Sequence, residues 1–141
     1  CEGSHSADLH KQIEEYSLKK YVLFKGFQDN PLDWMAASDV VVVPSRSEGL
    51  PLVIMEAFRS GTPVVAFSVP GCQDAITDGL TGIIVPAFEL DQFREAIETL
   101  INDSELAKEI SNNARRELET RFSYNRMIFE TIEVYRNIGF G

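Results

Sequence analysis

Two glutamates, Glu48 and Glu56, stand eight positions apart around the expected start of an apolar helix. Each carboxylate can accept hydrogen bonds from neighbouring hydroxyl groups such as those of a sugar. The free backbone amides at a helix start carry partial positive charge and stabilise anions such as a diphosphate. This combination predicts a site for a phosphate and a sugar, with Glu48 beside the amides and Glu56 in the second turn of the helix.

The amides expected to face the ligand are those of Gly49, Leu50 and Leu52, because Pro51 has no N–H group to donate. Gly49 also lets a ligand approach the backbone closely. Glu56 has mainly apolar neighbours in the predicted helix, so its charge requires a partner.

A purely structural interpretation of both glutamates stays open from these residues alone. Glu48 can be an exposed loop residue, and Glu56 can pair with Arg59, which is three residues further along the same helix. Parallel-sheet proteins of every function carry polar loops in this position, so the two interpretations have about equal weight.

Short apolar runs alternate with helical patterns through the first two-thirds of the chain. The runs predict buried strands at 21–24, 40–43, 63–67 and 83–85. Helices are predicted at 8–18, from Pro31, at 50–60 with Gly61 as C-cap, at 72–76, and through most of 90–141 with Ser104 and Ser123 as N-caps. The four valines at 40–43 predict a strand covered on both faces. The alternation predicts an α/β fold, a parallel sheet with helices on both faces that binds ligands at the carboxyl ends of its strands.

Composition narrows the classes of function. The 141 residues are enough for one domain and too few for two ordinary ones. The 13 basic and 22 acidic residues give a net charge of −9 without an extended basic cluster, which argues against nucleic-acid binding and against an anionic-membrane surface. Cys1 and Cys72 do not make a disulfide framework, and His5 and His10 lack the further ligands of a metal site. The first residues do not resemble a signal peptide, and the cytoplasm is the expected location.

The segment 44–57 has the pattern Pro-Ser-x-x-Glu-Gly-x-Pro-x-x-x-x-Glu-Ala, and Gly-x-Pro-Val-Val follows from Gly61. Further matching segments lie at 22–27, 37–40, 78–82 and 121–123. Together they resemble the C-terminal, donor-binding domain of the retaining glycosyltransferases of group 1, or family 4, which have the GT-B fold of two Rossmann-like domains. The resemblance runs in unbroken order over about 21–123.

The resemblance implies a division of roles around the helix start. Glu48 is implied as the catalytic-site residue that contacts the hydroxyls of the donor sugar. The amides of Gly49, Leu50 and Leu52 are implied to hold the sugar and the diphosphate together with Glu48. One departure from the family pattern, Pro51 in place of a second loop glycine, removes only an amide that was already discounted.

The resemblance also implies the nucleotide contacts and the activity. Glu56 is implied at the ribose hydroxyls, and the backbone near Phe27 at the base. The implied reaction transfers a hexose from a nucleoside-diphosphate sugar to a glycan, lipid or small-molecule acceptor, as in polysaccharide biosynthesis, with retention of configuration and without a metal or other cofactor. The alternatives are a non-catalytic nucleotide-sugar-binding module and a GT-B-type nucleotide-sugar epimerase.

Compared with that family, residues 1–141 are expected to be a single partial domain, truncated at its N-terminus, with C-terminal helices at 110–141. The Arg and Lys that neutralise the diphosphate, and the N-terminal acceptor domain, are expected to be missing. In the strand order 3-2-1-4-5-6 the chain would supply strands 3 to 6 and leave a central gap, which suggests self-association of the truncated sheet. The chain alone is expected to be inactive, and the missing domain offers a route to peripheral membrane attachment.

Overall fold

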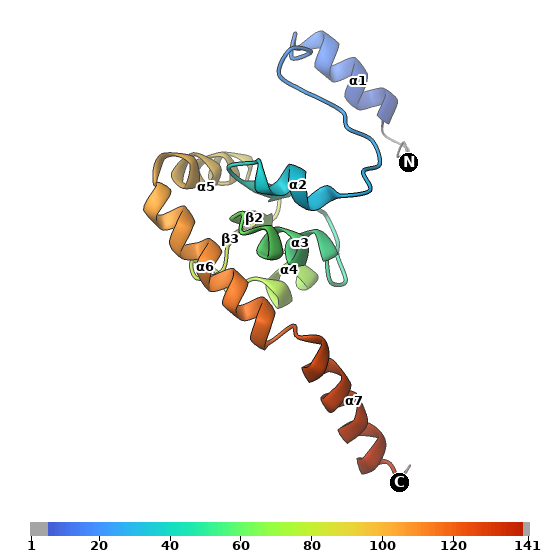
Figure 1. Ribbon diagram of the computed structural model, residues 1–141. Helices are drawn as coiled ribbons and strands as arrows, with labels where there is room; N and C mark the ends of the chain where they lie inside the picture. Colours follow the sequence, from blue (N-terminus) through green and yellow to red (C-terminus); the bar gives the residue numbers. More distant parts are fainter. Residues whose placement is uncertain (1–5, 140–141) are drawn as a thin grey trace. The chain divides into compact units, whose positions relative to one another are not determined.

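The computed structural model describes residues 6–139, and the chain divides into two compact units between Pro31 and Leu32. The first unit contains α1 (Ser6–Glu15), which is followed by an irregular segment (Figure 1). The second unit contains the sheet and the remaining helices.

Helix α1 confirms the helix predicted at 8–18, but it ends earlier. Ser17 adopts a positive φ of 56°, and the N–H of Leu18 donates to the carbonyl of Ile13 at 2.8 Å. This arrangement is a C-terminal capping motif, which stops the helix at Glu15.

The strand predicted at 21–24 does not form, and that prediction is wrong. Tyr21 and Val22 donate their amides to the carbonyl of Leu18, at 2.8 and 3.1 Å, and Leu23 is 72% exposed. A strand exists through hydrogen bonds to a neighbouring strand, and this segment has no such neighbour among the described residues. Its apolar composition alone is therefore not sufficient for a strand.

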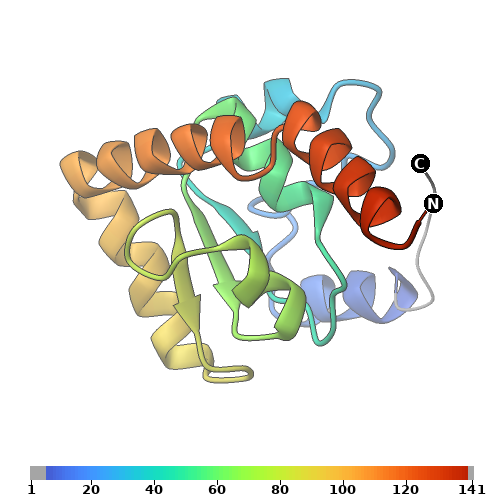
Figure 2. The ribbon, with the colours of Figure 1, turned by 90° about the horizontal axis from the view of Figure 1, so that it is seen from below.

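The second unit is built on three parallel strands, β1 (Val41–Val43), β2 (Val64–Phe67) and β3 (Ile83–Val85), in the order β1-β2-β3. They confirm the three later strand predictions. Figure 2 shows all three strands pointing in the same direction, so that their carboxyl ends lie at the same end of the sheet. The register pairs Val43 with Ala66 and Ala66 with Ile84.

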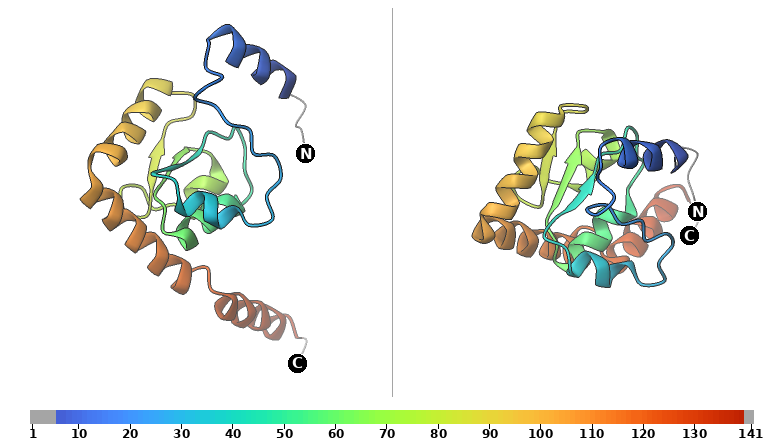
Figure 3. Two further views of the ribbon diagram at one scale, coloured as in Figure 1. Left: turned by 45° about the horizontal axis from the view of Figure 1, so that its top comes forward. Right: turned by 90° about the horizontal axis from the view of Figure 1, so that it is seen from above.

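Helices cover both faces of the sheet. The helices that follow α1 are α2 (Pro31–Ala36), α3 (Leu52–Ser60), α4 (Pro70–Ala75), α5 (Leu90–Asn102), α6 (Ser104–Thr120) and α7 (Tyr124–Asn137). Residues of α3, α4, α5 and α6 are buried against the sheet. On one face Val64 and Ala66 pack with α3 and α4, while on the other Val65 and Phe67 pack with α5. Figure 3 shows α5 and α6 running in succession along one side of the sheet. The Rossmann-like α/β fold predicted from the sequence is confirmed.

Strand β1 differs from its prediction in two ways. Val42 is 45% exposed, so the strand is not covered on both faces as four consecutive valines had indicated. Val42 pairs with Val65 and so points to the face that α5 covers, but α5 packs mainly on β2 and β3, and β1 lies at the side of the sheet where this cover ends. The described strands are also adjacent to one another, so the predicted supply of four strands around a gap is not what this chain forms.

The caps show how the sequence delimits its helices. Gly61 ends α3 as predicted, with a φ of 78° and its N–H directed to the carbonyls of Ala57 and Phe58. Ser123 caps α7 as predicted. For α6 the cap is Asp103 and not Ser104, because the carboxylate of Asp103 accepts from the amide of Leu106 at 2.9 Å.

The tail of the described chain is helical, as predicted, and α7 buries none of its residues. Among residues 6–139, no helix combines the length and the apolar character that crossing a membrane would require.

Replacing Asp103 with Ala is expected to lower the free energy of unfolding by about 1 kcal/mol, because an amide in the first turn of α6 loses its acceptor. Urea unfolding followed by circular dichroism measures the change. The matched control is Ser104→Ala, which leaves that bond intact and is expected to change stability by less than about 0.5 kcal/mol. The reverse order of the two effects would mean that Ser104 is the cap.

Candidate functional site

The segment between β1 and α3 passes over the start of α4. The N–H of Gly71 donates to the carbonyl of Glu48 at 3.2 Å. A Cβ atom on Gly71 would lie 2.6 Å from that carbonyl oxygen and would also overlap the backbone of Gly49. Because Gly71 has no side chain, α4 can hold the backbone of Glu48 and Gly49 in place.

Three backbone amides at the start of α3 are potential hydrogen-bond donors to a ligand. The N–H groups of Gly49, Leu50 and Leu52 donate no hydrogen bond within the described part of the chain, and the N-cap residue Pro51 offers no side-chain acceptor. Leu50 and Leu52 are both exposed, and a Cβ on Gly49 would meet no atom within 4 Å. The residues that carry these amides are therefore exposed, and the amides have no partner within residues 6–139.

Glu56 is half-buried on α3, whose residues Ile54, Ala57 and Phe58 are buried. Its carboxylate makes no hydrogen bond or ion pair with any described residue, and the pair with Arg59 that the structural interpretation required is not formed. A half-buried carboxylate is costly unless hydrogen-bond donors satisfy it. Its surroundings within the described chain supply none.

Glu48 is half-buried, and its negative charge acts on the thiol of Cys72. Burial raises the pKa of the Cys72 thiol, and the charge of Glu48 adds to the rise. Cys72 is a free cysteine in the core of the sheet-helix packing. The thiol is therefore neutral at pH 7, and this core packing lies next to the loop that carries Glu48.

Phe27 belongs to the first unit, where its ring is 80% exposed. Its expected place beside a nucleotide base stays a prediction. The other five site residues, from Glu48 to Glu56, all belong to the second unit.

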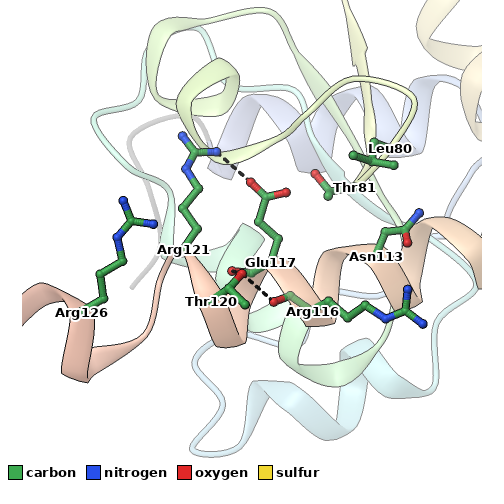
Figure 4. Close-up of a pocket in the computed structure, with 8 residues that line it drawn as sticks. All are labelled: Leu80, Thr81, Asn113, Arg116, Glu117, Thr120, Arg121 and Arg126. Atoms are coloured by element: carbon green, nitrogen blue, oxygen red, sulfur yellow. Dashed lines mark hydrogen bonds and ion pairs between the residues drawn. The ribbon is translucent and has the colours of Figure 1, made fainter.

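A cavity of about 410 Å³ opens elsewhere on the second unit, between α6 and the turn before β3 (Figure 4). Three of its lining residues are arginines, but they do not converge on one point. Arg121 pairs with Glu117 at 2.9 Å and donates to the carbonyl of Asp74, while Figure 4 shows Arg116 and Arg126 directed away from one another. The arginines therefore serve helix packing better than anion binding.

Sequence reasoning missed two residues at the carboxyl edge of the sheet, Gly71 and Phe88. Gly71 is one of the positions that resemble the glycosyltransferase family, but nothing in the sequence indicated which backbone approaches it. Phe88 follows β3 with a positive φ of 71°, which its residue type does not predict. Among the described residues, no group of three His, Cys, Asp or Glu side chains is placed to hold a metal ion.

A family model and individual proteins of similar sequence match this chain. The family model described as "Glycosyl transferases group 1" matches residues 2–117. Alpha-D-kanosaminyltransferase of Streptomyces kanamyceticus is 33% identical over 140 residues, which is 98% of this chain and 36% of that protein. D-inositol 3-phosphate glycosyltransferase of Paenarthrobacter aurescens is 40% identical over 136 residues, or 95% of this chain and 33% of that protein. The chain thus spans about a third of the length of these relatives.

The fold is also found among solved structures. HepE of Anabaena, solved in complex with UDP, superposes with a TM-score of 0.83 at 32% identity, over 91% of this chain and 36% of HepE. The same protein solved with UDP-glucose superposes with a TM-score of 0.81 at 31% identity.

Replacing Gly71 with Ala is expected to lower the free energy of unfolding by about 1 to 3 kcal/mol, because the new methyl group overlaps the backbone of Glu48 and Gly49. Thermal unfolding measures the change. Gly49→Ala is the control: its methyl group enters open space, and stability is expected to stay within about 0.5 kcal/mol of the wild type. Equal stability of the two variants would contradict the close packing of Gly71 against the backbone of Glu48 and Gly49.

The raised pKa of Cys72 predicts a pH dependence of stability. The folded chain holds the thiol proton more tightly than the unfolded chain, so this contribution is complete below the ordinary thiol pKa of 9.0 and is lost as pH rises through the higher folded value. The wild type is therefore expected to lose stability relative to Cys72→Ala above pH 9.0. Urea unfolding of both proteins in neutral and alkaline buffer tests this, and an unchanged difference between them would refute it.

Proposed function

The chain belongs to the glycosyl transferases group 1 family, and from this membership we propose that it supplies the donor site of a retaining glycosyltransferase. The proposed donor is a nucleoside-diphosphate sugar that carries a hexose. The observation that carries the proposal is the half-buried carboxylate of Glu56, which has no partner among residues 6–139, on the same helix whose first amides also lack one there.

Each proposed contact matches a chemical need of the site. The two hydroxyls of a ribose would donate to Glu56 and satisfy its charge. The free amides of Gly49, Leu50 and Leu52 would donate to the diphosphate and the sugar, at the positive end of the α3 dipole. Glu48, whose backbone is fixed by Gly71, would accept from hydroxyls of the donor sugar.

The HepE structures support a donor of this kind, because HepE was solved with UDP and with UDP-glucose and resembles this chain over nine-tenths of its length. The donor proposed for this chain is a hexose joined to a nucleoside diphosphate. Phe27 is retained as the proposed neighbour of the base.

In the proposed reaction, the bond between the anomeric carbon and the diphosphate oxygen breaks while the acceptor oxygen bonds to the same face of the sugar. The leaving diphosphate takes up the acceptor proton. The amides at the start of α3 would stabilise the negative charge that develops on the leaving group, an interaction that often supplies a large part of an enzymatic rate enhancement. No metal or cofactor is needed for this step.

The acceptor is proposed to be a glycan, a lipid or a small molecule, bound largely by an acceptor domain outside these 141 residues. The length of the relatives, of which the chain spans about a third, supports this division. A cytoplasmic location is proposed with it.

Replacing Glu56 with Gln in the polypeptide that carries this chain is expected to weaken UDP or GDP binding about tenfold, because a charge-assisted hydrogen bond to the ribose is lost. Isothermal titration calorimetry with UDP and with GDP measures the affinity. Glu109→Gln is the control, since Glu109 is exposed on α6 and away from the amides. Wild-type affinity in Glu56→Gln, or no binding of either nucleotide to the wild type, would refute the proposed donor site.

A further inference from the structure

The turn after β3 holds an aromatic residue in a backbone conformation that favours glycine. The N–H of Glu89 donates to the carbonyl of Pro86 at 3.2 Å and closes a four-residue turn. Phe88 is the third residue of that turn and has a φ of 71°. The third position of a turn with positive φ is normally glycine or asparagine. A phenylalanine there is strained, and strain of this kind is concentrated at functional sites.

Burial does not explain why phenylalanine occupies this position, because its side chain is 61% exposed. On the core side the ring lies near Phe67, whose ring centroid is 6.0 Å away at an interplanar angle of 45°. Phe67 is the last residue of β2 and is buried, so its ring has a fixed position. It supports the Phe88 ring on the core side and leaves that ring exposed. The ring is thus held in place and largely open to solvent.

Arg46 is the second neighbour of the ring. Its guanidinium carbon lies 5.9 Å from the ring centroid, within the range of a cation–π contact. Within the described part of the chain the guanidinium makes no ion pair or hydrogen bond, so its N–H donors are available. Arg46 follows β1, and Phe88 follows β3, so both lie at the carboxyl edge of the sheet, from which the segment after β3 projects in Figure 2.

We propose that Phe88 and Arg46 form a sugar-binding subsite for the acceptor. The C–H groups on one face of a pyranose ring carry partial positive charge, and they pack well against the negative face of an aromatic ring. The guanidinium beside it offers up to five N–H donors to sugar hydroxyls. The chemistry of the pair therefore fits a glycan acceptor better than an aliphatic one.

The position of the pair argues for the acceptor and not for the donor, and this step rests on the proposed function. Arg46 precedes Glu48, the proposed contact of the donor sugar, by two residues. The proposed nucleotide contact Glu56 lies on α3, which packs on the face of β2 formed by Val64 and Ala66, while Phe88 packs against Phe67, which belongs to the opposite face. A sugar held at Phe88 would therefore approach the donor sugar from the side away from the nucleotide.

Saturation-transfer difference NMR tests the subsite with methyl α-D-glucopyranoside, methyl α-D-mannopyranoside and methyl α-D-galactopyranoside as probes. The polypeptide that carries this chain is measured without UDP and with saturating UDP, so that binding at the donor site is separated from binding at the subsite. At least one probe is expected to bind in both conditions. Phe88→Gly and Arg46→Gln are each expected to weaken that binding about five- to tenfold, the loss typical of one aromatic or cationic contact.

Phe88→Gly also separates a binding role from a structural one. Glycine adopts the positive φ without strain, so the variant is expected to unfold at the wild-type temperature or above it while it loses the probe signal. Should that variant fold poorly, Arg46→Gln decides the question from a different loop. The control is Tyr124→Ala, which removes an exposed ring from α7 and is expected to leave the signal unchanged.

Calorimetry with UDP on the same proteins distinguishes the two proposals. Unchanged UDP affinity with loss of the glycoside signal in both variants supports the subsite. If UDP binds but the glycoside signal survives Phe88→Gly and Arg46→Gln, or no glycoside binds the wild type, the subsite is wrong and the donor site stands. If UDP does not bind but the glycosides require Phe88, the donor site is wrong and Phe88 belongs to a sugar site of another kind.

Discussion

The complete burial of β2 is the constraint on which the rest of the second unit depends. Val64, Val65 and Ala66 are fully inaccessible and Phe67 nearly so, because helices cover both faces and a strand lies on each side. Successive side chains point to opposite faces, so β2 contributes to both the α3–α4 packing and the α5 packing. With β2 fixed and all three strands parallel, the segments after β1, β2 and β3 all lie at the carboxyl ends of the strands, where both proposed sites lie.

The sequence predicted the strands that find a neighbouring strand among the described residues and failed for the apolar run that does not. Residues 64–67 and 83–85 have apolar runs and find neighbours in this chain, so they form the predicted strands. Residues 21–24 have an equally apolar run but no strand beside them among the described residues. The four valines at 40–43 indicated two covered faces, yet Val42 is exposed because α5 covers its face mainly at β2 and β3. Apolar composition reports what a segment can bury, and pairing decides what it does bury.

The candidate site divides in the same way. Glu48, Gly49 and Glu56 could be found from the sequence because a helix start and its first two turns are local features. The hydrogen bond from Gly71 to Glu48 joins residues that are far apart in the chain, and no local pattern predicts it. The contact of Arg46 with Phe88 joins two loops that are separated in the sequence by β2, and no local pattern predicts this contact either. What the sequence could not supply was therefore the packing between loops, which is also what positions the local groups.

The net charge of −9 raises the question of how such a chain could bind an anionic donor. Charges separated by more than about 8 Å are largely screened at physiological salt, so the distant carboxylates contribute little at the start of α3. The amides and the helix dipole act within hydrogen-bond distance and are not screened in this way. A nucleic acid or an anionic membrane would need positive charge over a wide surface, whereas a diphosphate is small enough to be held by one helix start. An acidic chain can thus be unsuited to the first two ligands and still suited to the third.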